Sequence, residues 1–438
     1  MRNLRYLIQP GGALCGHLRV PGDKSISHRA IMFGALAKGI TAITGFLEGE
    51  DCLATLNAFR AMGVRIGGPE QGQVTVHGVG LYGLRAPDGP LDMGNSGTSM
   101  RLMSGILAGQ AFDTVLTGDP SLTRRPMRRV TEPLAKMGAC IETTVNGAAP
   151  LHIHGNQRLS GIDYLLPVAS AQVKSCLLLA GLYAEGVTRI TEPAPTRDHT
   201  ERILEGFGYP LERENGRSVA VTGGGQLTGK AIDVPADLSS AAFFLAGASI
   251  APGSDLLLEH VGINPTRTGV IDILRLMGAD IEVLNPRQAG GEPVADLRVR
   301  YAPLHGIRIP EKLVPLAIDE FPALFIAAAC AKGVTILTGA AELRVKESDR
   351  IQGMADGLAA LGIAAEPTPD GLIIEGGTFS SGTVESHGDH RIAMSFAIAA
   401  LRASGPLSIY DCANVNTSFP GFVSLACNAG LQITEQTL

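Results

Sequence analysis

The sequence lacks tryptophan, and its aromatic residues make up only 5% of 438 positions. It also lacks a long hydrophobic run: the longest, near residues 241–251 and 322–331, fall short of the ~20 residues that span a bilayer. Residues 1–12 hold two arginines and a proline and no apolar stretch suited to a signal peptide. These absences argue against a membrane or secreted protein, so we expect a cytoplasmic one.

Excess positive charge is absent as well. The formal net charge is −6, which argues against a nucleic-acid partner. The seven cysteines are odd in number and form no Cys-x-x-Cys pair, which predicts reduced, mostly buried thiols. Only His387 and His390 lie in a candidate loop, without the spacing of a metal site. We therefore expect no metal and no cofactor.

Glycine is abundant, with 55 residues, and it marks an internal repeat. An amphipathic helix pattern ends in glycine before a short strand-like run six times, which suits a left-handed helix stop. These glycines are Gly63, Gly138, Gly208, Gly278, Gly362 and Gly430. Each repeat also opens with a more apolar helix, expected to be buried. These helices are predicted at 26–36, 98–107, 172–182, 239–248, 321–329 and 392–400.

The pattern predicts an α/β protein of two similar domains, each with three β-α-β-α-β-β repeats around buried central helices. One such repeat cannot bury its helix alone, so repeats must group, and three per domain suits the length. A solenoid of six repeats is the competing arrangement. Only residues 21–22 and 233–237 need cross between the domains.

The starts of the buried helices carry the chemistry. Ser, Thr, Asn and Asp there are explained by helix capping. Capping does not explain Lys24, Arg29, Arg101 and Arg391, because the helix dipole disfavours cations in the first turn. Cations at that end are reasonable when an anion binds to the free backbone N–H groups. We therefore expect anionic substrates.

Other loops add arginines and lysines. Arg125 precedes a proline that fixes the backbone, and Lys346 with Arg350 are spaced to share one helix face, which favours function. For Arg128 and Arg129 a solvated helix face is an equal alternative. Guanidinium groups suit carboxylates and phosphates because they bind two oxygens in one plane.

Carboxylates are also available for proton transfer. Asp319 and Glu320 open the fifth buried helix, and Glu347 adjoins Lys346. A carboxylate among many cations should stay ionised, as a base does. Asp349 and Asp389 are interpreted as structural partners of nearby arginines.

Several long segments resemble the signatures of the 5-enolpyruvylshikimate-3-phosphate synthase family. They are residues 21–29, 94–101, 125–126, 344–350 and 388–391. The likeness runs from near residue 10 to near residue 425. It implies transfer of the enolpyruvyl group of phosphoenolpyruvate to the 5-hydroxyl of shikimate 3-phosphate, releasing phosphate, on the path to chorismate and aromatic amino acids. It also implies two three-repeat domains, 23–240 and 1–22 plus 241–438, with the active site in the cleft between them, and we expect a monomer.

The same resemblance assigns residues. Shikimate 3-phosphate would contact Lys24, Ser25, Arg29, Ser170, Ala171, Gln172, Arg197, Asp319 and Lys346. Phosphoenolpyruvate would contact Lys24, Gly97, Arg125, Gln172, Arg350 and Arg391. Asp319 would deprotonate the 5-hydroxyl and Glu347 would protonate the methylene carbon, while Lys24 and Lys346 assist charge development and phosphate departure.

One feature departs from the family pattern. Many members carry a lysine in the final loop, but residues 416–420 contain none, which, with residues 196–201, resembles the second branch of the family. Some members of that branch have alanine at the position of Gly97, associated with glyphosate tolerance. The glycine here predicts sensitivity.

Two alternatives remain. The UDP-N-acetylglucosamine enolpyruvyl transferases share the fold and the donor, but their reactive-loop cysteine has no counterpart in residues 121–129. A non-catalytic repeat protein that binds an anionic metabolite would not need Asp319 and Glu347.

Overall fold

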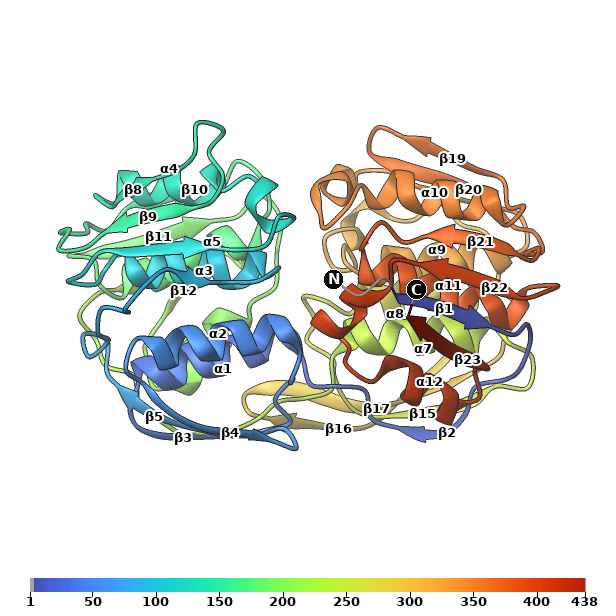
Figure 1. The fold of residues 1–438 in the computed structure, drawn as a ribbon, viewed down its shortest axis with the longest axis horizontal. Helices are drawn as coiled ribbons and strands as arrows, with labels where there is room; N and C mark the ends of the chain where they lie inside the picture. The colour runs from blue at the N-terminus through green and yellow to red at the C-terminus, as the bar shows by residue number, and fades with distance from the viewer. Residues whose placement is uncertain (1–3, 438) are drawn as a thin grey trace. The chain divides into compact units, whose positions relative to one another are not determined.

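The computed structural model describes residues 4–437, which divide into two compact units (Figure 1). The first unit comprises Gly22–Val234 and the short segment Ala289–Glu292, and the second unit comprises the rest of the chain. Each unit has a hydrophobic core of its own. No helix in the described range is long and apolar enough to cross a membrane.

The first unit contains three of the buried helices, α1, α3 and α5. In chain order its elements are α1 (Lys24–Leu36), β3 (Lys38–Thr44), α2 (Glu50–Ala61), β4 (Arg65–Glu70), β5 (Gln73–Val79), β6 (Leu91–Asp92), α3 (Gly97–Leu107), β7 (Thr114–Thr117), α4 (Arg128–Lys136), β8 (Cys140–Glu142), β9 (Leu151–His154), β10 (Asp163–Leu165), α5 (Ala171–Gly181), β11 (Val187–Thr191), α6 (His199–Gly206), β12 (Glu212–Glu214), β13 (Ser218–Thr222) and β14 (Ala231–Asp233). Figure 1 shows the helices between the sheets of this unit.

The second unit repeats the plan with α7, α9 and α11 as its buried helices. In chain order its elements are β1 (Leu4–Ile8), β2 (Cys15–Leu18), α7 (Leu238–Ile250), β15 (Asp255–Gly262), α8 (Gly269–Leu276), β16 (Asp280–Ala289), β17 (Glu292–Arg300), α9 (Phe321–Cys330), β18 (Val334–Leu337), α10 (Arg350–Ala360), β19 (Ala365–Thr368), β20 (Gly371–Glu375), β21 (Gly382–Glu385), α11 (His390–Ala399), β22 (Leu407–Tyr410), α12 (Phe422–Ala429) and β23 (Ile433–Thr437). Only the tip of the β16–β17 hairpin groups with the first unit.

The unit boundaries differ in two details from those expected. Residue 240 lies inside α7, whose residues are all buried and whose N-terminus is capped by Asp237, so the whole helix belongs to the second unit. The hairpin tip Ala289–Glu292 is a further place where the chain passes between units, beyond the two predicted.

Five of the six sheets of residues 4–437 share one four-stranded connectivity, and the sixth, β18-β20-β19, has the same order without a leading strand, which confirms the repeat. In β6-β7-β9-β8, for example, β6 and β7 flank buried α3 and pair in parallel, while β9 pairs antiparallel with both β7 and β8. The sheet β10-β11-β13-β12 does the same around α5. Three such sheets in each compact unit are inconsistent with a solenoid of six repeats.

Three of the six repeats are completed by a strand from elsewhere in the chain. The first sheet takes β14 as its leading strand, parallel to β3, and the sheet around α7 takes β2, parallel to β15. In the last sheet β1 inserts between β22 and β23, antiparallel to both. Strands can pair and satisfy their backbone N–H and C=O groups however far apart they lie in the sequence. The spacing of the repeats therefore does not show that all strands of a sheet come from one continuous segment.

The predicted helix ends are confirmed. All six glycines of the repeat have positive φ, between 82° and 117°, a conformation that side chains disfavour. At the starts of five of the six buried helices, Asp23, Ser96, Ser170, Asp237 and Asp389 each accept a hydrogen bond from a backbone N–H of the helix they precede. Each of these helices therefore starts at a polar capping residue.

Candidate functional site

Lys24 lies in the first turn of α1, where Asp23 accepts a hydrogen bond from Ile26 N at 2.8 Å. Its ammonium group pairs with the nearly buried carboxylate of Asp51, at 2.5 Å from Nζ to Oδ2. Asp51 was not foreseen, because at the start of α2 it reads as an ordinary helix-end acid. The pair orients Lys24, whose side chain remains 21% exposed.

Arg29 is far more enclosed than the sequence suggested. It is 3% exposed, and its guanidinium donates to Ser25 O at 2.9 Å, Thr200 Oγ1 at 2.7 Å and Ser175 Oγ at 2.9 Å. Burial lowers its pKa to about 10, although Glu201 opposes that shift, so it stays charged at neutral pH. The charge of Arg197 also acts on it.

Gly97 lies between two guanidinium groups at the start of α3. A Cβ at this position would be 2.8 Å from Arg101 Nη1 and 3.4 Å from Arg125 Nη1. Arg101 donates to Gln172 Oε1 at 2.7 Å, and Arg125 Nη2 donates to Asn95 Oδ1 at 2.6 Å. Two cations at a helix N-terminus form a suitable site for an anion. Arg101, noted in the sequence only as a misplaced cation, belongs to this group.

A chain of buried hydrogen bonds joins the starts of α1 and α3. His28 Nδ1 lies 2.8 Å from Thr55 Oγ1, which lies 2.6 Å from Ser99 Oγ. Ser99 in turn donates to the capping Ser96 at 2.7 Å. Burial, with the charges of Lys24 and Arg29, holds the pKa of His28 well below its usual range, so the imidazole is neutral. Sequence spacing gave no signal for this network.

The remaining predicted residues of the first unit are found in two places. Ser170 caps α5 through Val173 N at 3.4 Å, next to Ala171 and Gln172. Arg197 is partly buried in the loop between β11 and α6. Arg128 and Arg129 are exposed on α4, as expected of a solvated face.

Asp319, directly before the N-cap of α9, lies near two cations of the second unit. Its Oδ1 is 3.4 Å from Lys346 Nζ and 3.6 Å from Arg350 Nη1. Its backbone carbonyl accepts a hydrogen bond from Arg391 Nη1 at 2.9 Å. Three predicted substrate residues therefore meet one predicted base.

Arg350 is held by carboxylates on several sides. Its Nε is 2.8 Å from Asp389 Oδ2, and its Nη2 is 2.6 Å from Glu347 Oε2. Burial alone would lower the pKa of Arg350, but Asp389 and Glu347 raise it above its ordinary value. Burial opposes ionisation of Asp389 too, yet Arg350 keeps the pKa of that carboxyl below its usual range.

Two expectations about this loop have different outcomes. The prediction that Lys346 and Arg350 share one helix face is wrong, because Lys346 follows the 3-10 helix Ala341–Val345 and Arg350 starts α10. Both nevertheless reach Asp319. The structural reading of Asp349 and Asp389 is confirmed: Asp349 caps α10 and pairs with Arg344 at 2.6 Å.

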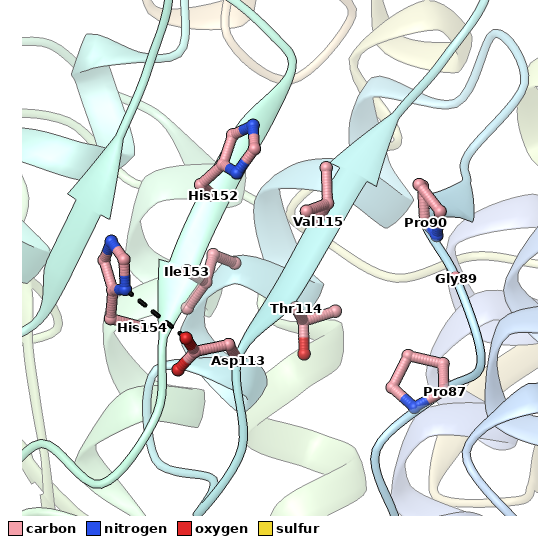
Figure 2. Close-up of a pocket in the computed structure, with 9 residues that line it drawn as sticks. All are labelled: Pro87, Gly89, Pro90, Asp113, Thr114, Val115, His152, Ile153 and His154. Carbon is pink, nitrogen blue, oxygen red and sulfur yellow. Dashed lines mark ion pairs between the residues drawn. The ribbon is translucent and has the colours of Figure 1, made fainter.

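A pocket of about 240 Å³ lies away from all these residues, against β7 and β9 of the first unit (Figure 2). Figure 2 shows His154 facing Asp113, with 3.6 Å between Nδ1 and Oδ2. Within residues 4–437, no group of three or more His, Cys, Asp or Glu side chains is arranged to hold a metal ion. The cysteines are free, but only three of the seven are buried, so the expectation of mostly buried thiols is wrong.

Comparison with known proteins identifies the family. The profile of EPSP synthase (3-phosphoshikimate 1-carboxyvinyltransferase) matches residues 8–425. A relative from Methylococcus capsulatus with the name 3-phosphoshikimate 1-carboxyvinyltransferase is 71% identical over 99% of each chain. One from Legionella pneumophila with the same name is 59% identical over 99% of each.

Solved structures agree. EPSP synthase from Acinetobacter baumannii superposes with a TM-score of 0.90 and 60% identity, covering 99% of this chain and 100% of that one. The enolpyruvyl transferase NikO from Streptomyces tendae, at 16% identity, TM-score 0.79 and full coverage of both chains, shares the fold. With its sequence matched nearly end to end, this chain belongs to the EPSP synthase family.

Proposed function

We propose that this chain is a 3-phosphoshikimate 1-carboxyvinyltransferase of the shikimate pathway, which moves the enolpyruvyl group of phosphoenolpyruvate to the 5-hydroxyl of shikimate 3-phosphate and releases phosphate. Its membership of the family, with relatives of that name at up to 71% identity, supports the activity. The proposed chemistry rests on the position of Asp319, whose carboxylate lies within 3.6 Å of both Lys346 and Arg350. A cation-flanked carboxylate of this kind stays ionised and can accept a proton.

The first unit supplies most of the binding groups for shikimate 3-phosphate: Lys24, Ser25, Ser170, Ala171, Gln172 and Arg197. Arg29 acts differently from its neighbours. Three of its five N–H groups donate to Ser25, Thr200 and Ser175, so it holds Ser25 in place as well as contributing positive charge. This arrangement favours a phosphate dianion beside Ser25 and Arg29.

Phosphoenolpyruvate carries a carboxylate and a phosphate, and cations from both units serve it. In the first unit, Lys24, Arg125 and Gln172 act beside Gly97, whose missing side chain leaves room next to the guanidinium groups. In the second unit the binding residues are Arg350 and Arg391. Fixed cations stabilise the charge that develops in the tetrahedral adduct, which is usually the largest contribution to catalysis.

The reaction proceeds by addition and elimination. Asp319 takes the proton of the 5-hydroxyl as the oxygen bonds to C2 of phosphoenolpyruvate, and Glu347 delivers a proton to C3. Loss of a C3 proton and cleavage of the C2–O bond to phosphate then restore the double bond. Glu347 is ion-paired with Arg350, and the incoming carboxylate adds one more anion to the three carboxylates already near that guanidinium, which favours the protonated form of Glu347. Lys24 and Lys346 stabilise the departing phosphate.

A phosphate-release assay tests the activity. We expect release with phosphoenolpyruvate plus shikimate 3-phosphate and none with phosphoenolpyruvate plus UDP-N-acetylglucosamine. The reverse result would identify the other enolpyruvyl transfer, and no release with either acceptor would favour a binding protein.

Lys24→Ala tests the contribution of the first unit. We expect kcat to fall about 10²–10³-fold, the usual cost of removing one charge-stabilising group, with an unchanged circular dichroism spectrum. Lys38→Ala, an exposed lysine at the start of β3, is the control. Turnover that survives Lys24→Ala would remove this residue from the mechanism.

Location and assembly are further parts of the proposal. Seven free thiols suit a reducing cytoplasm. Every proposed substrate contact comes from one chain, so we propose that the monomer is active, and light scattering under assay conditions measures this directly.

A further inference from the structure

Three charged side chains are buried together behind the loop that carries Arg197. Lys174 Nζ of α5 lies 2.9 Å from Glu192 Oε2 and 2.7 Å from Glu201 Oε1. The side chains of Lys174, Glu192 and Glu201, here called the buried triad, are 2%, 7% and 3% exposed. None of them is among the residues proposed to contact a substrate.

The two carboxylates of the triad favour the charged form of Lys174. Burial alone would lower the pKa of Lys174, but Glu201 and Glu192 raise it above its ordinary value. The second carboxylate is not left unbalanced, because Glu201 also acts on the buried cation Arg29. Desolvating such groups costs about as much as their attraction returns, so apolar side chains of similar volume would stabilise the fold at least as well. A buried triad therefore calls for another explanation.

The position of the buried triad supplies an explanation for it. Glu192 directly follows β11 and Glu201 lies in the first turn of α6, so the two carboxylates stand on either side of the segment that holds Arg197. Thr196, next to Arg197, donates its hydroxyl to Glu192. Lys174 lies two residues beyond Gln172 on α5. The triad thus ties both ends of the Arg197 loop to the helix that presents Ser170, Ala171 and Gln172.

Neighbouring bonds fix the first turn of α6 further. His199 Nδ1 lies 2.8 Å from Glu292 Oε1, and both side chains are buried. Thr200 donates to Ser175 at 2.7 Å and accepts from Arg29. Three consecutive residues of α6 are therefore bonded to other parts of the first unit, His199 to the hairpin tip and both Thr200 and Glu201 to α5, so Arg197 precedes an anchored helix turn.

We propose that the buried triad is a positioning device, which holds the loop so that Arg197 meets the phosphate of shikimate 3-phosphate. This rests on the proposed function. The three residues act through Arg197 and do not contact substrate. Their loss should weaken the use of shikimate 3-phosphate while leaving the use of phosphoenolpyruvate and the chemical step nearly intact.

Glu201→Gln removes one charge and keeps the side-chain shape. We expect the KM for shikimate 3-phosphate to rise about ten-fold, because a small misplacement of a binding group costs that much or more. The KM for phosphoenolpyruvate and kcat should each stay within about two-fold, since neither depends on the Arg197 contact. The matched control is Glu205→Gln on the same helix, which breaks an exposed 2.9 Å pair with Arg213 and should change nothing.

A second variant guards against misfolding. Removing one member of a buried ion pair can strongly destabilise a protein, because it leaves an uncompensated charge. The triple variant Lys174→Met, Glu192→Gln and Glu201→Gln leaves no charged member of the triad behind. We expect it to melt close to the wild-type temperature and still show the raised KM for shikimate 3-phosphate.

A double-mutant cycle with Arg197→Ala completes the test. If the triad acts through Arg197, Glu201→Gln should have little further effect on that KM once Arg197 is gone. An unchanged KM in a folded variant, an undiminished effect without Arg197, or a triple variant that does not fold would each overturn the positioning role. A wild-type enzyme that releases no phosphate would instead overturn the proposed function itself.

Discussion

The two units are built from the same repeat, but Arg29 and Arg125 of the first unit have different kinds of partner from Arg350 of the second. In the first unit, the buried Arg29 donates to three neutral oxygens, and Arg125 donates to Asn95 and Ser121. In the second unit, Arg350 is surrounded by the carboxylates of Asp389, Glu347 and Asp319. A guanidinium bonded to neutral groups keeps a positive charge that is available to bind an anion. A guanidinium bonded to carboxylates instead fixes the position of those carboxylates. The comparison suggests that the first unit mainly binds and the second mainly transfers protons.

The largest expected effect tests the second half of that comparison. Asp319→Asn removes the proposed base, so kcat should fall about 10²–10⁴-fold, the range for general acid–base catalysis. Binding of shikimate 3-phosphate, measured by calorimetry, should persist because the first unit provides most of its contacts. Asp356→Asn, an exposed change on α10, serves as the control. Normal turnover by Asp319→Asn would contradict the proposed division of roles between the two units.

The next effect is on stability and its dependence on pH. Asp389 is fully buried against Arg350, and removing one partner of such a pair costs about 3–5 kcal/mol. We expect Asp389→Asn to lower the free energy of unfolding by that order in urea titrations at pH 7. Asp255→Asn, which breaks an exposed pair with Arg298, should change it little.

The sign of the pH dependence follows from the direction of each shift. The pKa of Asp389 is lowered in the folded state, so its contribution is complete above the unfolded value of about 3.9 and is lost as pH falls through the folded pKa. The pKa of Lys174 is raised, so its contribution is present below about 10.4 and is lost as pH rises through the folded pKa. Asp389→Asn should therefore make the free energy of unfolding fall less steeply at acidic pH and leave its fall at alkaline pH unchanged. An unaltered dependence at acidic pH would contradict this assignment.

The smallest effect concerns discrimination between anions in the first unit. Gly97→Ala places a methyl group 2.8 Å from Arg101 Nη1, so that guanidinium must move. We expect micromolar glyphosate to inhibit the wild type, and Gly97→Ala to weaken that inhibition about ten-fold or more, as one added carbon can in a close-fitting site. Gly89→Ala has open space around its Cβ and is the control. Wild-type activity untouched by micromolar glyphosate would show that the missing side chain does not decide sensitivity.

Local features of the fold were predictable because each depends on a few adjacent residues. The stop at Gly63 needs one residue with positive φ, and the start at Asp23 needs one side-chain acceptor. The strands β1, β2 and β14 could not be assigned to their sheets, because their partners lie far away in the chain. The alternation of apolar and polar residues predicts a strand but does not show which strand it pairs with.

The same limit applies to the site. Lys24, Arg125 and Asp319 were found because family motifs and helix starts mark them. The ion pairs Lys24–Asp51 and Lys174–Glu201 each join two different helices, so no periodicity links their members. The spacing of Lys346 and Arg350 led to a wrong prediction of a shared helix face. Residues four apart share a face only inside a continuous helix, and the chain between these two residues is not helical.

The insertion of β1 between β22 and β23 has a consequence for biosynthesis. Residues 22–234 can complete nearly all of the first core as soon as they leave the ribosome, because only the hairpin tip Ala289–Glu292 arrives later. The second core must wait for β22 and β23, since β1 pairs with both. While the chain between β1 and β22 is being made, β1 therefore carries unpaired backbone groups, and a chaperone that binds exposed strand edges would act on this segment.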